Sequence, residues 1–204
     1  MIIKVCGLKL QNNLNAVIET GIDMVGFNYY PKSKRYLDHS LEVTDKQVKR
    51  VGVFVNAEIE DIKSLVKRDG LHYAQLHGDE SVAICQAVKT FTKVIKVFRV
   101  NETFDFSQVI DFEFCDLFLF DTYTSDYGGS GKTFDWNALN AYKGDTPFLL
   151  SGGIGPHSVA NLKEFQHPKY IGIDINSRFE TSPGVKDVSL VQTFIKELNT
   201  TPKK

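Results

Sequence analysis

Two residues of this sequence have side chains suited to acid–base chemistry. Cys6 ends the first apolar run of the chain, and Asp121 directly follows the very apolar residues 116–120. A carboxyl group at the mouth of an apolar strand can have a raised pKa and act as a general acid. A lone cysteine is also a common core residue, however, and an aspartate at a strand end is also a common cap. Residue type alone therefore leaves both interpretations open.

Two further polar side chains could take part in binding or proton transfer. His77 is either a base or a packed histidine, and Arg35 is either a solvated surface charge or a bidentate clamp for a carboxylate. Metal binding is not indicated, because the sequence has no HxH, HExxH or carboxylate–histidine cluster. The glycine fingerprint of dinucleotide binding is also missing after the first predicted strand. The sequence therefore predicts proton transfer without metal or cofactor.

Glycine-rich turns indicate where an anion would bind. Gly152 and Gly153 follow the seventh predicted strand, and a second glycine turn at residues 182–184 precedes the last predicted helix. Backbone N–H groups in such turns can bind phosphate, and barrels often bind it after strands seven and eight. Residues 128–133 resemble a P-loop, but that motif requires glycine where the sequence has Asp126. They are either a loop that closes over a ligand or a surface turn.

Eight apolar runs must position these residues. They are near-continuous rather than alternating, which is typical of parallel strands buried on both faces. They begin near Ile2, Met24, Val51, Tyr73, Val94, Asp116, Pro147 and Tyr170. Helical patterns are expected at residues 15–20, 57–68, 80–90, 136–142, 159–165 and 188–198, and are weak after the second and fifth strands. The alternation predicts an α/β fold, a (β/α)8 TIM barrel with its active site at the carboxyl ends of the strands, with an open doubly wound sheet as the alternative.

Composition limits the possible settings. The chain has 204 residues, and we expect one barrel domain over 1–204 with a frayed tail at 199–204. The formal net charge of -1 argues against binding nucleic acid. Three irregularly spaced cysteines favour a reducing cytoplasm, and no apolar stretch is long enough for a membrane span. A monomer is favoured over a homodimer.

Read together, the strand ends resemble those of the phosphoribosylanthranilate isomerase family. The resemblance extends, in family order, from the first strand to the last helix. The matching motifs are KVCG at 4–7, GFNYYPKSKRY at 26–36, VGVFVN at 51–56, QLHG at 75–78, GGSGKTFDW at 128–136, SGGI at 151–154, DINS at 174–177 and PGVKD at 183–187. The resemblance implies a compact ribulose-phosphate-binding barrel that performs a cofactor-free Amadori rearrangement in tryptophan biosynthesis.

The resemblance also implies roles for individual residues. Asp121 would be the general acid that opens the ribose ring, and Cys6, as thiolate, would be the base that removes the C2′ proton. Arg35 would hold the anthranilate carboxylate. The substrate phosphate would bind near Gly152, Gly153, Asn176 and Ser177, and the pocket would also include Gln75, His77 and Gly129 of the loop 128–133. The implied partner is therefore a phosphorylated small molecule. Strand alternation places Lys4 on the same face as Cys6, where it could activate the thiol.

The sequence departs from the family pattern at three positions. Lys34 stands where the family usually has proline, Arg178 where it usually has glycine, and Asn176 where serine is common. An arginine in place of a glycine with positive φ would strain the phosphate loop, or it could contact the phosphate itself. Two other functions stay open: a sibling aminoaldose isomerase of the histidine pathway, and a phosphometabolite-binding module without activity.

Overall fold

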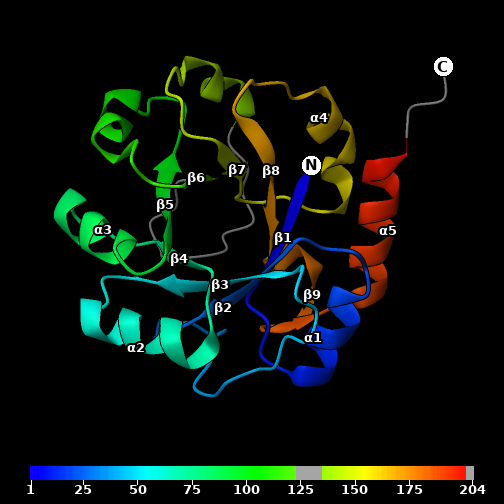
Figure 1. The fold of residues 1–204 in the computed structure, drawn as a ribbon. Helices are drawn as coiled ribbons and strands as arrows, with labels where there is room; N and C mark the ends of the chain where they lie inside the picture. Colours follow the sequence, from blue (N-terminus) through cyan, green and yellow to red (C-terminus); the bar gives the residue numbers. More distant parts are fainter. Residues whose placement is uncertain (123–134, 201–204) are drawn as a thin grey trace.

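Eight parallel strands form a closed barrel in chain order, and β8 pairs with β1 (Figure 1). The computed structural model describes residues 1–122 and 135–200. The strands are β1 (Ile2–Cys6), β2 (Met24–Asn28), β3 (Lys49–Phe54), β4 (Tyr73–Leu76), β5 (Lys93–Val100), β6 (Leu117–Thr122), β7 (Phe148–Leu150) and β8 (Tyr170–Ile175). This architecture confirms the predicted (β/α)8 barrel, and the pairing of β8 with β1 rules out the open sheet.

The strands bury both of their faces, which explains their near-continuous apolar sequences. One apolar cluster fills the barrel interior and contains Met24, Val51, Ile95, Val97, Leu117, Leu119 and Leu149. A larger cluster lies between the strands and the outer helices and includes Ile3 and Val5 of β1. Because side chains alternate along a strand, Lys4 and Cys6 lie on the inner side of β1 together with Ile2.

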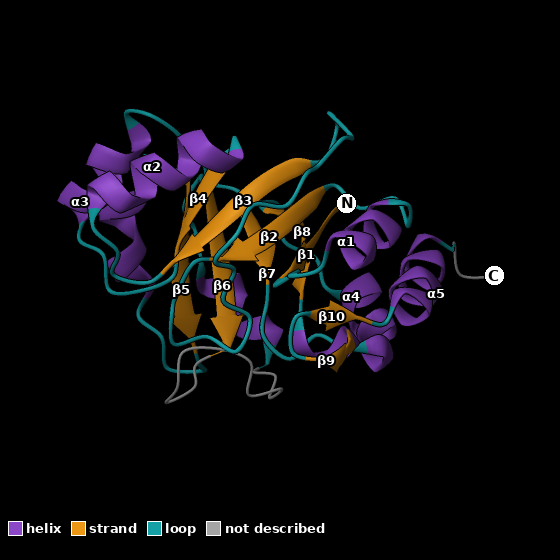
Figure 2. Ribbon diagram, turned by 90° about the horizontal axis from the view of Figure 1, so that it is seen from below, coloured by secondary structure: helices purple, strands orange, loops and turns teal. Residues whose placement is uncertain are grey.

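Helices cover the outside of the barrel (Figure 2). They are α1 (Gln11–Ile18), α2 (Ile59–Asp69), α3 (Val82–Lys89), α4 (Val159–Glu164) and α5 (Val188–Asn199). The prediction at 15–20 was wrong at its start, since α1 begins four residues earlier at Gln11. The segment predicted at 136–142 is a 3₁₀-helix, Trp136–Ala141, and another, Phe106–Phe112, follows β5. Within the described residues 29–48, which follow β2, the chain has no helix, in line with the weak pattern there.

A small antiparallel ribbon follows β8 and was not predicted. It consists of β9 (Glu180–Ser182) and β10 (Val185–Lys186). Gly184 turns the chain between them with a φ of 91°, in the left-handed region that glycine favours. Asp187 then caps α5 by accepting a hydrogen bond from Leu190 N. Figures 1 and 2 both show this ribbon beside α1 and α5.

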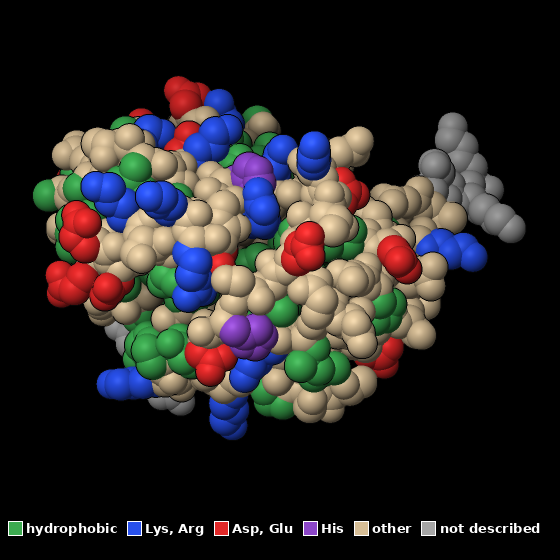
Figure 3. All heavy atoms as spheres, turned by 60° about the horizontal axis from the view of Figure 1, so that its bottom comes forward, with side chains coloured by type: hydrophobic (Ala, Val, Ile, Leu, Met, Phe, Trp, Pro, Cys, Tyr) green, Lys and Arg blue, Asp and Glu red, His purple; other side chains and the backbone are tan. Residues whose placement is uncertain are grey.

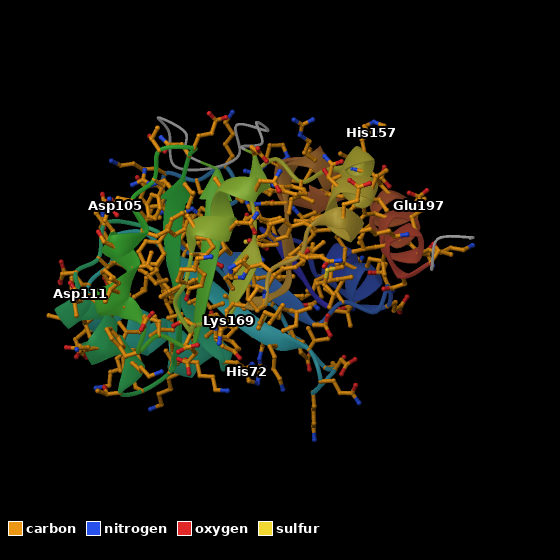
Figure 4. The ribbon with its side chains drawn as sticks, turned by 90° about the horizontal axis from the view of Figure 1, so that it is seen from above. His72, Asp105, Asp111, His157, Lys169 and Glu197 are labelled. Atoms are coloured by element: carbon orange, nitrogen blue, oxygen red, sulfur yellow. The ribbon has the colours of Figure 1, made fainter. Side chains whose placement is uncertain are left out.

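The surface and the C-terminal end are ordinary for a globular chain. On the face shown in Figure 3, acidic and basic side chains are interspersed.

Helix α5 continues to Asn199, and Thr200 N–H donates to Lys196 O, so the first two residues of the predicted frayed tail, 199 and 200, are ordered. None of the helices in the described part of the chain has the length and apolar character needed to span a bilayer.

Candidate active site

A cavity of about 260 Å³ lies at the carboxyl ends of the strands. It brings together every predicted site residue that the structure describes: Cys6, Arg35, Gln75, His77, Asp121, Gly152, Gly153, Asn176 and Ser177. Gly129 and the loop 128–133 lie outside the described residues. Residues far apart in the sequence therefore meet at the face where barrel enzymes bind their substrates.

Cys6 lies at the inner end of β1 and is buried. Lys4, two residues earlier on the same face, forms an ion pair with Asp174 of β8, with 2.9 Å between Nζ and Oδ1. Burial raises the pKa of the Cys6 thiol above its ordinary value, and the positive charge of Lys4 opposes that rise. The structure thus confirms that Lys4 shares the inner face with Cys6, while the thiol stays harder to ionise than a free one.

Asp121 extends the inward-facing series of Leu117 and Leu119 on β6 and reaches the cavity. The Nε2 atom of His77 lies 3.4 Å from Asp121 Oδ2. On its other side, His77 Nδ1 lies 3.1 Å from Nε2 of the buried Gln75. When the Gln75 amide donates to Nδ1, the neutral ring carries its hydrogen on Nε2 and directs it at Asp121. The three side chains therefore form a row that orients the carboxyl group.

Arg35 is already engaged by a protein carboxylate. Its Nε lies 2.9 Å from Glu180 Oε1, and its Nη2 lies 2.6 Å from Glu180 Oε2. This geometry is the two-point fork that arginine forms with carboxylates. The same edge of the guanidinium is therefore not available for a second bidentate pair, and Nη1 is the nitrogen without a hydrogen-bond partner among the described residues. Lys34, beside Arg35, also lines the cavity.

A second wall of the cavity has the backbone geometry of an anion site. Gly152 and Gly153 follow β7 with φ values of 85° and 66°, which glycine adopts without strain. Asn176 and Ser177 follow β8 and complete this wall. The turns lie at the place where barrels commonly hold a phosphate, and backbone N–H groups of such turns can bind an anion.

Arg178 does not strain this wall. Among the described residues, only Asn56 has a positive φ without being glycine, so the backbone at Arg178 is ordinary. The side chain lines a neighbouring hollow with Trp136 and Gly155, not the cavity that contains Cys6. A Cβ atom at Gly155 would lie 3.2 Å from Arg178 Cδ, so the arginine stem packs closely over that glycine. The expectation of backbone strain at this position was wrong.

Sequence comparisons place the chain among known enzymes. Residues 3–197 match the family model described as N-(5'phosphoribosyl)anthranilate (PRA) isomerase. The chain belongs to the phosphoribosylanthranilate isomerase family. It is 48% identical over 200 residues to the N-(5'-phosphoribosyl)anthranilate isomerase of Phocaeicola vulgatus, covering 97% of this chain and 98% of the relative.

Solved structures of the family share the fold. The phosphoribosyl anthranilate isomerase of Thermotoga maritima superposes with a TM-score of 0.85 at 34% identity, covering 97% of this chain and 98% of the other. A further family structure, with a TM-score of 0.81 at 31% identity and the same coverage, is a complex with reduced 1-(o-carboxyphenylamino)-1-deoxyribulose 5-phosphate. The name of that ligand contains both a carboxyl group and a phosphate.

Three residues of the site were not predicted from the sequence. Glu180 and Lys186 join Arg35 to Asn176, because Lys186 Nζ lies 2.6 Å from Glu180 Oε1 and 2.6 Å from Asn176 Oδ1. Gly7 has a φ of 81°, and a Cβ atom there would lie 2.6 Å from Arg35 Cδ. Gly7 and Lys186 fall within motifs that resemble the phosphoribosylanthranilate isomerase family, and Glu180 lies between two of them, but a motif does not say which of its residues touch.

No metal centre is evident in the described part of this family member. Among residues 1–122 and 135–200, no group of three or more His, Cys, Asp or Glu side chains is arranged to hold a metal ion. The charged groups around the cavity are instead paired with one another, as in Lys4–Asp174 and Arg35–Glu180.

Proposed function

We propose that this chain isomerises N-(5-phosphoribosyl)anthranilate to 1-(2-carboxyphenylamino)-1-deoxyribulose 5-phosphate, with Asp121 as acid and Cys6 as base. The observation that carries the proposal is that both side chains line one cavity, whose walls also include Arg35 and the glycine turns. An aminoaldose with a phosphate at one end and a carboxylate at the other matches those two walls.

The rearrangement needs one proton donor and one proton acceptor. Protonated Asp121 gives its proton to the ring oxygen as the bond from that oxygen to C1′ breaks, which opens the ribose to an iminium ion. The Cys6 thiolate then takes the C2′ proton, and the electron pair moves to form an enolamine. Proton gain at C1′ and proton loss from the C2′ hydroxyl give the ketone. The substrate neither gains nor loses atoms, and solvent exchange returns both side chains to their starting states.

The surroundings of each group suit these roles. Lys4 places a positive charge near the Cys6 thiol and offsets part of the cost of forming a buried thiolate. His77 directs its Nε2 at Asp121 and holds the carboxyl group beside the cavity. His77 and Asp121 are each only 17% exposed, which keeps most solvent away from the reacting bond.

The first test is the fluorescence of phosphoribosylanthranilate, made in situ and mixed with the purified protein. We expect enzyme-dependent loss of fluorescence faster than spontaneous hydrolysis, without accumulation of free anthranilate. A rate no greater than background would refute the assigned substrate. The histidine-pathway aminoaldose should be assayed in parallel, because turnover of that compound alone would favour the sibling isomerase and turnover of neither would favour a binding module.

The proposed setting is a monomer in the cytoplasm. The three cysteines are free and buried, which suits a reducing compartment. The Thermotoga maritima relative is described as dimeric, so the two family members would differ in assembly. Light scattering of the purified chain tests this, and a mass of two chains would refute the monomer.

A further inference from the structure

We infer that Glu180 is a positioning residue that holds Arg35 in place and thereby makes the enzyme selective for an arylamine bearing a carboxylate. This inference rests on the proposed function, since it concerns how the same cavity distinguishes its substrate. Glu180 does not line the cavity, whereas Arg35 does. Any effect of Glu180 on the substrate must therefore pass through a neighbouring side chain.

The contacts around Glu180 show how tightly it is fixed. Its carboxylate accepts hydrogen bonds from Arg35 on one side, and from Lys186 Nζ and the backbone N–H of Gly184 on the other. The Glu180 side chain is 4% exposed and that of Lys186 is fully buried. Burial alone would raise the pKa of Glu180, but the hydrogen bonds from Arg35 and the charge of Lys186 hold it below its ordinary value. Glu180 is therefore a permanent anion at this position.

This anion has two consequences for Arg35. An arginine side chain has many rotamers, and a fixed bidentate partner removes most of them before the substrate arrives. With Nε and Nη2 bound to Glu180, the remaining nitrogen Nη1 is the one left to meet a substrate carboxylate. One carboxylate also balances only one of the two cations, Arg35 and Lys186. The cluster stays net positive and attracts an anion.

The same cluster also reaches the wall of the cavity that contains Asn176. Lys186 Nζ donates to Asn176 Oδ1, and Asn176 lies in the proposed phosphate turn. Gly7 lets these groups meet, because a Cβ atom there would lie 2.6 Å from Arg35 Cδ and 2.9 Å from Asn176 Oδ1. The proposed carboxylate end and phosphate end of the site are thus held at a fixed distance by the connected side chains of Arg35, Glu180, Lys186 and Asn176.

The test compares two substrates that differ only in the carboxylate. These are N-(5-phosphoribosyl)anthranilate and N-(5-phosphoribosyl)aniline, both formed from the amine and ribose 5-phosphate. We expect the natural protein to prefer the first by at least about tenfold in kcat/KM. In E180Q, kcat/KM for the anthranilate should fall about tenfold, mainly through KM, while the value for the aniline changes less than about threefold. A merely structural role would lower both values together.

Controls separate the possible outcomes. E80Q removes another buried glutamate of the barrel that contacts a lysine but not Arg35, and it should keep the selectivity. In a background of Arg35→Met, the substitution E180Q should add little further loss, because both act through one contact. If E180Q does not fold, E180D keeps the charge on a shorter side chain and should show part of the same loss of selectivity.

The results also distinguish this inference from the proposed function. An active natural protein whose selectivity survives E180Q and E180D, or that shows no selectivity, overturns the positioning role of Glu180 alone. A natural protein inactive on both substrates overturns the proposed function and this inference together.

Discussion

Two buried glutamate–lysine pairs lie at the carboxyl ends of the strands, and they serve different parts of the molecule. Glu80 binds Lys96 Nζ at 2.8 Å and accepts backbone N–H groups of Asn56 and Gly78. Glu180 binds Lys186 Nζ at 2.6 Å and accepts the backbone N–H of Gly184. In both pairs a carboxylate is fixed by one lysine and by turn amides, so the local chemistry is nearly the same.

The two pairs differ in the surroundings that their side chains contact. Lys96 alternates with the inward-facing Ile95 and Val97 on β5 and therefore points outward, toward the layer beneath the helices. Glu180 instead also accepts hydrogen bonds from Arg35, and Arg35 lines the cavity. Whether a buried ion pair serves stability or function thus depends on which further side chains its members contact, and not on the geometry of the pair itself.

The largest expected difference in kcat is between variants of residues that line the cavity and a variant of a buried residue that does not. We expect Cys6→Ala and Asp121→Asn each to lower kcat by about 10³-fold, because each removes one of the two proton-transfer groups. Cys85→Ala removes another buried cysteine, one that does not line the cavity, and should leave kcat unchanged. Steady-state kinetics with circular dichroism checks this, and near-native turnover in either cavity variant would disprove its assigned role.

The Glu80 pair should show the opposite pattern. Glu80→Gln leaves Lys96 buried without its counter-charge, and we expect the free energy of unfolding to fall by about 3 kcal/mol. Because this pair does not reach the cavity, kcat/KM of the folded variant should stay within about twofold of the natural value. Urea unfolding and kinetics at low temperature measure the two quantities. A folded E80Q protein with strongly reduced kcat/KM would contradict the prediction that the Glu80 pair affects stability but not activity.

The pH dependence offers a third comparison. Since burial raises the pKa of Cys6, the thiolate is the minor form near neutral pH, and the fraction of Cys6 present as thiolate should rise about tenfold per pH unit until that pKa is reached. The charge of Lys186 lowers the pKa of Cys6, so Lys186→Met should move the rise to higher pH, whereas Lys96→Met should not. Rates of alkylation of the Cys6 peptide, measured by mass spectrometry, report the same midpoint. Identical profiles for both variants would contradict the assignment.

Arg178 should give the smallest effect. It lies two residues before Glu180 but lines the neighbouring hollow, so nearness in sequence does not bring its charge into the cavity. We expect Arg178→Gly to change KM for phosphoribosylanthranilate by less than about threefold. A rise of more than about tenfold, with kcat unchanged, would instead assign the arginine to phosphate binding.

Local patterns were enough to predict the barrel. Eight apolar runs gave eight strands, because burial on both faces leaves a clear mark on each strand separately. The helix boundaries were less well defined: α1 begins at Gln11, although the apolar pattern indicated residues 15–20. The first turn of α1 consists of polar residues, which show no apolar periodicity. Leu10, the residue before the helix, is extended and makes no side-chain capping hydrogen bond, so no capping signal marks the start of the helix.

Contacts between distant parts of the chain explain what the sequence did not predict. The position of Arg35 on a loop was predicted, but its partner Glu180 is 145 residues away and lies on an unpredicted ribbon. Arg178 looked strained only when compared with a family glycine, and the backbone there adopts an ordinary turn instead. In each case the deciding fact is which side chains meet across the mouth of the barrel, and residue spacing does not encode that.

The ion pair of Lys4 with Asp174 also bears on the order in which the chain folds. The register of β1 and β8 sets these two residues directly opposite each other, although β1 is synthesised first and β8 nearly last. A partial barrel lacking β8 would bury an ammonium group without its counter-charge, so closing the inner face of β1 before β8 arrives costs free energy. Ring closure is therefore a late event that awaits the last strand. A slip of β8 by one residue would turn Asp174 away from Lys4 and leave that ammonium unpaired, so the same pair rejects misaligned closure.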